Sequence, residues 1–182
     1  MKRKVMITLQ PITNPQKLEE YYRFRYSIYS ESRNRIFLKG EEGIDRDGHD
    51  ARAMHFGGYV DDELMACDRI IPVKRVEDVY LLEDMRDEHA RNAIINLVSS
   101  KHAQGHRVAE SSRTCLASQH RSISNAKQLV LAVAACAHRA GYDEGLFGCD
   151  RSQAAFYVRL GFEVLGVLEP SPLKELRSPS VS

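Results

Sequence analysis

The sequence predicts an α/β (α+β) domain built around a mixed β-sheet with helices packed on it. Residues 54–60 and 64–71 are apolar segments joined by Asp61-Asp62-Glu63, which is the pattern of a β-hairpin. Beyond the hairpin, patterns typical of helices and strands alternate up to residue 168. Alternation of this kind is typical of helices that cover a sheet. A chain of 182 residues is long enough for one domain over 1–182 with a sizeable core.

Asn14 and Pro15 predict the start of a helix that runs to about Tyr29, because Asn is a preferred N-cap and Pro fits the first turn. Residues 31–53 are charged and irregular, and the hairpin follows them. The later elements are a helix over about 82–100, a strand over 106–116, a helix over 125–139 ended by Gly141, a strand at 146–147, a helix from the cap Asp150 to Gly161, and a last strand over 162–168. Residues 177–182 are expected to form a frayed tail.

Composition and charge exclude several classes of protein. There are 26 Lys and Arg against 25 Asp and Glu, so no strong field favours nucleic acid. The longest apolar stretches fall short of the roughly 20 residues of a spanning helix, and no signal-peptide pattern is seen. The four Cys are isolated, with no C-x-x-C pair, which argues against a metal module or a disulfide scaffold. We therefore expect a cytoplasmic protein without metal, membrane anchor or nucleic-acid partner.

The C-terminal third carries the first resemblance. A polar segment beginning at Arg121 precedes the long helix, and Tyr157, Gly161 and Phe162 end the next one. This order of elements and residues resembles the GNAT acyltransferase superfamily over about residues 54–168, and the resemblance implies a mostly antiparallel central sheet flanked by helices. In that superfamily an R-G-x-G-x-A loop binds the acyl donor's pyrophosphate with its backbone N–H groups at a helix N-terminus. The resemblance implies donor phosphopantetheine binding by Arg121, Ser122, Ser124, Asn125 and Ala126, with two serines replacing the glycines.

A second resemblance concerns dispersed charged residues. Their spacing follows the pattern R-x-x-x-F, E-x-D-x-x-D, R and E-x-x-R of the acyl-homoserine-lactone synthases, and the matching positions are Arg25, Tyr29, Asp45, Asp47, Asp50, Arg69, Glu110 and Arg113. Tyr29 and Asp45 depart from the pattern, and no Trp is present. The sequence therefore resembles a related branch, the N-acyl amino acid synthases of the long-chain N-acyltyrosine type, which take acyl chains from acyl carrier protein. The implied substrate-binding residues are Arg25, Arg33, Asp47, Asp50, Arg69 and Arg113.

The resemblance implies aminolysis of a fatty acyl thioester, with no cofactor beyond the phosphopantetheine of the acyl carrier protein. An α-amine with a pKa of about 7.7–8 is mostly protonated at neutral pH, so a carboxylate must take its proton. Glu110 is the first candidate and Asp45 the second. A backbone N–H of Thr114 or Cys115 would face the oxyanion, and Tyr157 would protonate the leaving thiolate.

Several alternatives stay open at this point. The alternatives are a lactone synthase that uses S-adenosylmethionine, a coenzyme A-dependent acetyltransferase and an acyl-binding module without turnover. The missing glycines disfavour the acetyltransferase. The charged set is alternatively a structural ion-pair network, and Tyr157 a core residue. Cys115 as a nucleophile is a weaker hypothesis. The basic residues that would dock an acidic carrier protein, or else be ordinary surface charges, are Arg121, Lys127, Arg139, Arg151 and Arg159.

Overall fold

The computed structural model describes residues 6–31, 35, 37–83 and 85–165. These residues form one sheet in the order β1-β2-β3-β4-β5. The first four strands pair antiparallel and β5 pairs parallel to β4, which confirms the predicted mixed, mostly antiparallel sheet. The strands are β1 (Leu9–Pro11), β2 (Met54–Val60), β3 (Glu63–Val73), β4 (Val108–Leu116) and β5 (Glu144–Leu146).

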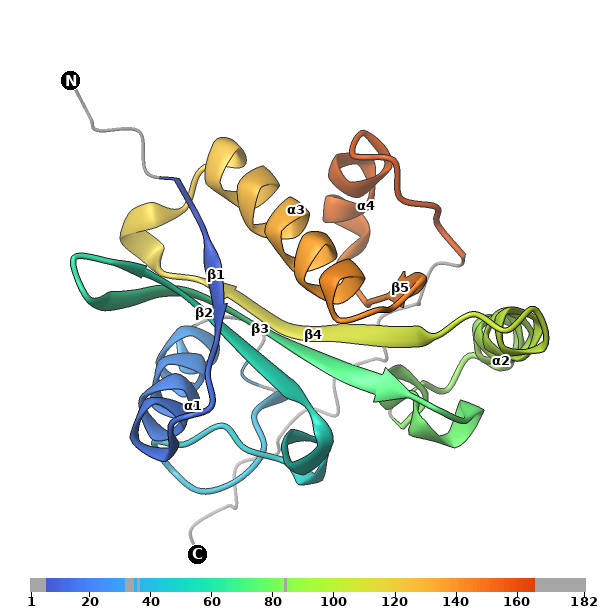
Figure 1. The fold of residues 1–182 in the computed structure, drawn as a ribbon, viewed down its shortest axis with the longest axis horizontal. Helices are drawn as coiled ribbons and strands as arrows, with labels where there is room; N and C mark the ends of the chain where they lie inside the picture. Colours follow the sequence, from blue (N-terminus) through green and yellow to red (C-terminus); the bar gives the residue numbers. More distant parts are fainter. Residues whose placement is uncertain (1–5, 32–34, 36, 84, 166–182) are drawn as a thin grey trace, which may run out of the picture.

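Helices cover both faces of this sheet. Figure 1 shows α1 (Pro15–Ser30) on one face and both α3 (Ile123–Arg139) and α4 (Arg151–Val158) on the other, with α2 (Glu88–Ala103) at the far end of β3 and β4. The α3 side buries Leu129 and Val133 against Ile70 of β3. The α1 side buries Tyr21 and Cys67. The sheet therefore separates two cores, and a strand side chain belongs to one or the other.

Most predicted elements are present with shifted ends. The side chain of Asn14 accepts the backbone N–H groups of Gln16 and Lys17, so α1 begins as predicted. Gly141, just after α3, has a φ of +84°, the left-handed conformation that suits glycine at a helix end. Helix α2 starts at Glu88 rather than near residue 82, because residues 76–78 and 80–82 form 3-10 turns instead.

One observed strand was missed, and one predicted strand is not found in the described residues. Strand β1 was not predicted, since three residues ending in Pro11 carry no readable periodicity. The last strand was predicted over 162–168, yet residues 162–165 are not in a strand. Phe162 instead packs its ring against Phe147 and Tyr157, and Val164 is exposed. Residues 166–168 and the expected tail at 177–182 lie outside the described residues.

A β-bulge in β4 shapes the centre of the sheet. The register of β3 against β4 shifts between Cys67 and Arg69, and opposite this point Arg113 has a φ of +58°. A positive φ is uncommon for a residue other than glycine and marks a local constraint. The bulge re-aims the side chains of β4 next to the point where β4 and β5 stop pairing.

Candidate functional site

The alternation of strand side chains divides the candidate site residues between the two faces. Successive side chains of a strand point to opposite faces, so Asp68 and Arg69 of β3 are on different sides. Ser111 and Thr114 of β4 line a cavity on the α3 side. Glu110 belongs to the α1 and α2 side, where it contacts the segment that precedes α2.

A buried ion-pair network occupies the α1 side. Arg25 of α1 donates from Nε to Asp45 Oδ2 at 2.8 Å and from Nη1 to Asp50 Oδ1 at 2.7 Å. Arg69 of β3 donates to Asp47 Oδ1 at 2.6 Å and lies 3.1 Å from Asp50 Oδ1. The side chains of Arg25, Asp45, Asp50 and Arg69 are fully buried. The network therefore fastens the irregular segment that contains the three aspartates to α1 and β3.

Arg113 joins the same network from the bulge. Its Nε lies 2.9 Å from Asp45 Oδ2, and its Nη2 donates to the carbonyl oxygen of Phe37 at 2.7 Å. The rings of Tyr29 and Tyr80 lie 5.4 and 5.5 Å from its guanidinium carbon. Arg33, the remaining predicted substrate-binding residue, lies outside the described residues. The structure thus brings together the predicted Arg25, Asp45, Asp47, Asp50, Arg69 and Arg113.

The network holds Asp47 and Asp50 ionised. Burial alone would raise the pKa of Asp50, but Arg25 and Arg69 outweigh it and lower that pKa below its usual range. Asp47 shows the same balance, with Arg69 as its main partner. Two buried atoms, Arg69 Nη2 and Asp47 Oδ2, have no hydrogen-bond partner within the described residues. Arg69 Nη2 is therefore an unused donor, whereas Asp47 Oδ2, although it accepts no hydrogen bond, lies 3.6 Å from Arg113 Nη2.

Glu110 lies fully buried beside the network. Its carboxylate accepts the backbone N–H of Tyr80 at 2.7 Å and that of Leu81 at 3.1 Å. Burial raises the pKa of Glu110 to about 7, although these two N–H groups act in the opposite direction. The contacts show that Glu110 fastens the segment before α2 to β4, and its role as a base stays a prediction.

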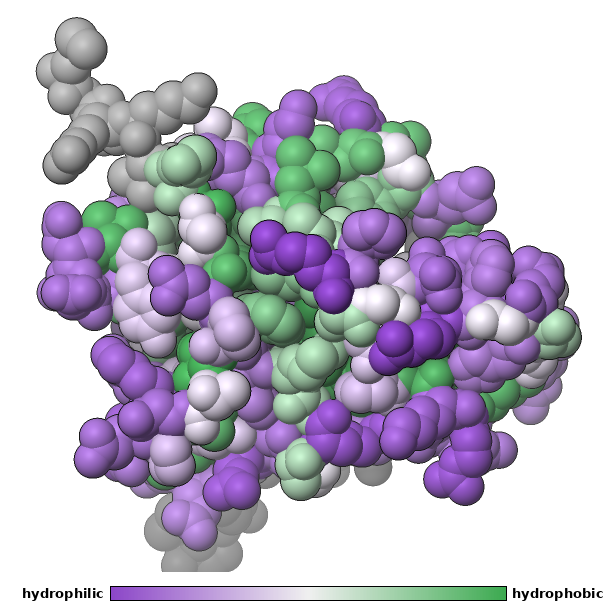
Figure 2. Space-filling model, viewed as in Figure 1, coloured by the Kyte–Doolittle hydropathy of each residue, from purple (hydrophilic) through white to green (hydrophobic). Residues whose placement is uncertain are grey.

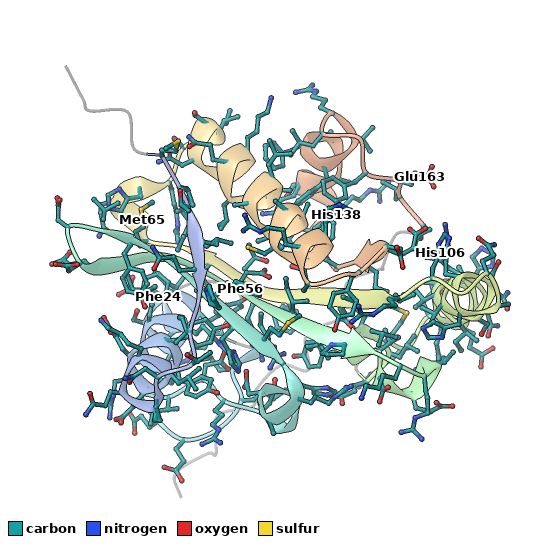
Figure 3. All side chains as sticks on the ribbon, in the orientation of Figure 1. Phe24, Phe56, Met65, His106, His138 and Glu163 are labelled. Atoms are coloured by element: carbon teal, nitrogen blue, oxygen red, sulfur yellow. The ribbon has the colours of Figure 1, made fainter. Side chains whose placement is uncertain are left out.

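An apolar cavity of about 210 Å³ lies on the α3 side, between α3, β4, β5 and α4. Its apolar wall includes Ile70, Val133, Ala137, Leu146 and Phe162. His138, labelled in Figure 3 on the C-terminal half of α3, also lines it. The cavity has the lining of a site for an aliphatic chain.

Tyr157 of α4 lines this cavity. Its ring centroid lies 4.6 Å from that of Phe147 and 5.9 Å from that of Phe162. Burial, with smaller contributions from Cys149 and Asp68, raises the pKa of Tyr157 to about 12. The hydroxyl is therefore protonated at neutral pH, and the residue both packs in an aromatic cluster and faces the cavity.

The predicted donor loop forms the capped start of α3. The side chain of Ser122 accepts the backbone N–H of Asn125 at 3.1 Å, and Arg121 Nε donates to the carbonyl oxygen of Leu116 at 3.2 Å. Ser122 and Ser124 are exposed and do not line the cavity. The first cavity residue on α3 is Val130, about 12 Å along the helix from Ser122 at 1.5 Å per residue. The role of Arg121, Ser122, Ser124, Asn125 and Ala126 in donor binding stays a prediction.

Sequence reasoning missed Asp68 and Ser111. The carboxylate Oδ1 of Asp68 accepts the hydroxyl of Ser111 at 2.8 Å and that of Thr114 at 2.6 Å. Asp68 is fully buried, and burial raises its pKa to about 7. The available signal was an acid in the middle of the apolar segment 64–71. Cys115, by contrast, lies in the α1-side core with Cys67 and does not line the cavity.

The described residues contain no group of three or more His, Cys, Asp and Glu side chains placed to hold a metal ion. None of the helices in the described ranges is long and apolar enough to cross a membrane.

Comparison with solved structures identifies the class of fold. FeeM, an N-acyl amino acid synthase from uncultured soil microbes, superposes with a TM-score of 0.59 at 16% identity over 90% of this chain and 81% of its own. The acyl-homoserine-lactone synthase LasI gives a TM-score of 0.64 at 15% identity, covering 86% and 79%. BjaI, described as a coenzyme A-dependent lactone synthase, gives 0.62 at 17% identity, covering 87% and 72%. The fold is that of the GNAT acyltransferases.

The family follows from the sequence. No curated protein sequence matches the chain significantly. The family model described as the N-acyl amino acid synthase FeeM matches residues 20–181, so the chain belongs to that family. It is an acyltransferase, and its family's reaction is the transfer of an acyl group to an amine.

Proposed function

We propose that this protein moves a medium or long fatty acyl chain from acyl carrier protein to the α-amine of an amino acid, giving an N-acyl amino acid. Tyrosine is the acceptor that the sequence resemblance favours. The proposal rests on two neighbouring compartments, one on each side of β3 and β4. An apolar cavity lies on one side, and a buried charged cluster with an unused donor, Arg69 Nη2, lies on the other.

The charged cluster suits the acceptor. Arg69 Nη2 is an unused donor for the α-carboxylate of an amino acid. Asp47 Oδ2, which lies 3.6 Å from Arg113 Nη2 but accepts no hydrogen bond among the described residues, is an acceptor for its ammonium group. The arginine fork is planar and binds carboxylates well. Arg25 and Asp50 then hold these two side chains in place, as the predicted substrate-binding set requires.

The cavity suits the donor. Each buried methylene contributes about 0.8 kcal/mol, so an apolar cavity favours a long chain. The phosphopantetheine arm would follow α3 to its N-terminus, where one phosphate needs fewer backbone N–H groups than a pyrophosphate. This accounts for serines at positions 122 and 124.

The surface around these helices suits an acidic carrier protein. Lys127, Arg151 and Arg159 are exposed and form no ion pair within the described part of the chain. Figure 2 shows hydrophobic residues reaching the surface around α3 between hydrophilic ones. Electrostatic attraction to such a surface speeds encounter and weakens as salt increases.

The reaction is an aminolysis. The amine nitrogen attacks the thioester carbonyl carbon, the C–N bond forms and the C–S bond breaks. Glu110, or Asp45 as second choice, takes the amine proton from the α1 side, and Tyr157 gives a proton to the leaving thiolate from the α3 side. The two sides would meet beyond Glu110 and Leu146, where β4 and β5 stop pairing. A backbone N–H of Thr114 or Cys115 stabilises the oxyanion. Of the two carboxylates, Glu110 is favoured, since Asp45 Oδ2 contacts both Arg25 and Arg113.

The test is a reconstituted reaction followed by mass spectrometry. The purified protein is incubated with dodecanoyl or tetradecanoyl acyl carrier protein, or with the matching coenzyme A thioesters, and the twenty amino acids. We expect an N-acyl amino acid that forms faster from the carrier protein. Faster turnover from coenzyme A would overturn the donor assignment, and methylthioadenosine release from added S-adenosylmethionine would indicate a lactone synthase. Absence of any acylated amine would sink the proposal.

A matched pair of variants tests the acceptor site. Arg69→Met should abolish amino-acid saturation, whereas Arg75→Met, on a side chain that is 74% exposed, should not change it.

A further inference from the structure

We infer that the phenol ring of Tyr80 is a gate over the acceptor site, and that it turns aside before an amino acid can reach Arg69. This inference rests on the proposed function and adds the route by which its acceptor enters. Tyr80 begins the 3-10 turn Tyr80–Leu82, which lies between β3 and α2.

The acceptor site is closed to solvent in the structure. The side chain of Arg69 is fully buried, and its unused donor Nη2 is buried with it. The side chain of Arg113 is 4% exposed and that of Asp47 is 10% exposed. An amino acid that comes from solvent therefore cannot contact Arg69 unless a covering group moves.

The ring of Tyr80 is placed to be that covering group. Its centroid lies 5.1 Å from Cζ of Arg69 and 5.5 Å from Cζ of Arg113, which are cation–π distances. The ring of His49 packs against it edge-on, with the centroids 5.0 Å apart. Tyr80 is half-buried whereas both arginines are buried, so its side chain borders solvent and the guanidinium groups lie behind it.

The backbone of Tyr80 is fixed, so the movement belongs to its side chain. The carboxylate of Glu110 accepts the N–H groups of Tyr80 and Leu81 at 2.7 Å and 3.1 Å. Val79 and Leu82 on either side are buried in the core beneath α2. Lifting the turn would break these hydrogen bonds and expose two apolar side chains, whereas rotation about the side-chain bonds of Tyr80 leaves all of them in place.

An amino acid would hold the gate open. Turning the ring aside gives up its contacts with two guanidinium groups. An α-carboxylate on Arg69 replaces them with a charge-assisted hydrogen bond, which is the stronger interaction. Because this ligand binds only the open state, it shifts the population to that state. Without an acceptor the ring closes over the cluster and keeps water out of the site, where water would otherwise hydrolyse the donor.

The first experiment measures how the acyl donor divides between amine and water. Each variant receives dodecanoyl carrier protein and the amino acids, and the N-acyl product and free dodecanoic acid are quantified by mass spectrometry. Tyr80→Ala should raise the share of free acid about tenfold, because its site stays open to water. Tyr80→Phe retains the ring and should keep the wild-type ratio. So should Tyr59→Ala, which removes a half-buried tyrosine that lies over Lys17 at 5.2 Å. An unchanged ratio in Tyr80→Ala would overturn the gate while leaving the acyltransferase proposal standing.

The second experiment needs no turnover, so it tests the gate even where no acylated amine forms and the proposed function fails. Phenylglyoxal reacts with accessible arginines, and peptide mass spectrometry gives the rate of modification at Arg69. With the open state populated at about 10% or less, Tyr80→Ala should raise that rate at least tenfold, whereas Tyr80→Phe should not. In the wild type the slow reaction of Arg69 should not change at low urea concentrations, because a turning side chain exposes little new surface. Reaction of wild-type Arg69 only where urea unfolds the protein, or an equal rate in Tyr80→Ala, would overturn the gate.

Discussion

Replacing Arg25 by Met should cost this protein much of its stability. Arg25 is fully buried and bridges Asp45 and Asp50, at 2.8 Å and 2.7 Å. Methionine fills similar space but leaves both carboxylates facing a thioether. The remaining arginines of the network, Arg69 and Arg113, cannot form the lost hydrogen bonds without moving from their own partners.

The magnitude follows from the chemistry of buried charges. Removing one partner of a buried pair typically costs about 3–5 kcal/mol, because the other charge is left without compensation. For a protein of this size each kcal/mol lowers the melting temperature by roughly 2–4 °C. The expected decrease for Arg25→Met is therefore about 6–20 °C. Adding Asp50→Asn to Arg25→Met should recover part of it, since it removes one of the two buried carboxylates that have lost Arg25.

The control is available on the same helix. Arg23, two residues away, pairs with Glu19 at 2.8 Å, but both side chains are 59% exposed. Exposed pairs contribute about 0–1 kcal/mol, so Arg23→Met should change the melting temperature little. Circular dichroism melts and urea titrations of the two variants give the comparison. If Arg25→Met lost no more than Arg23→Met, the account of the network as a structural clamp would be refuted.

Three further outcomes are expected. Burial raises the pKa of Glu110 from 4.5 to about 7, so between these pH values the native state binds a proton that the unfolded state has lost, and stability falls as pH rises. Urea titrations between pH 5 and 8 should therefore show a smaller loss of stability for Glu110→Gln than for the wild type. An unchanged dependence of stability on pH would contradict this. Tyr157→Phe should lower kcat by about 10²-fold with little change in KM, as expected for a proton donor, with the melting temperature showing that the aromatic cluster is intact. Ala137→Leu should shift the products toward chains shorter by about three carbons, because the added carbons occupy the cavity, whereas Ala135→Leu, exposed and outside the cavity, should leave the chain-length profile unchanged.

Local signals predicted much of the fold. Asn14 and Pro15 mark the start of α1, and Gly141 marks the end of α3, because both positions depend on the backbone of a few neighbouring residues. The ends of α2 and the presence of β1 depend on tertiary contacts. The segment before α2 is fastened by the Glu110 carboxylate, thirty residues away in sequence from Tyr80. Strand β1 forms because it pairs with the edge of β2.

The site shows a similar division. Spacing predicted which charged residues belong together, since Arg25, Asp45, Asp47, Asp50, Arg69 and Arg113 converge in one cluster. Spacing did not show that the cluster is nearly closed to solvent, which decides how strongly each charge depends on its partner. It also gave no sign that the Asp68 face of β3 borders a cavity, because that depends on how α3 and α4 pack on the sheet.

The bulge at Arg113 links the two faces. It takes one residue of β4 into a left-handed conformation, so that Arg113 reaches Asp45 on one side while Thr114 reaches Asp68 on the other. A regular strand would put the neighbours Ser112 and Arg113 on opposite faces. Here Ser112 accepts from Arg69 Nε at 3.0 Å and Arg113 pairs with Asp45, so both lie on the α1 side. The charged network holds Arg113 in this conformation. Loosening it should therefore move Thr114 and the cavity wall as well, which makes the charged network and the apolar cavity parts of one mechanical unit.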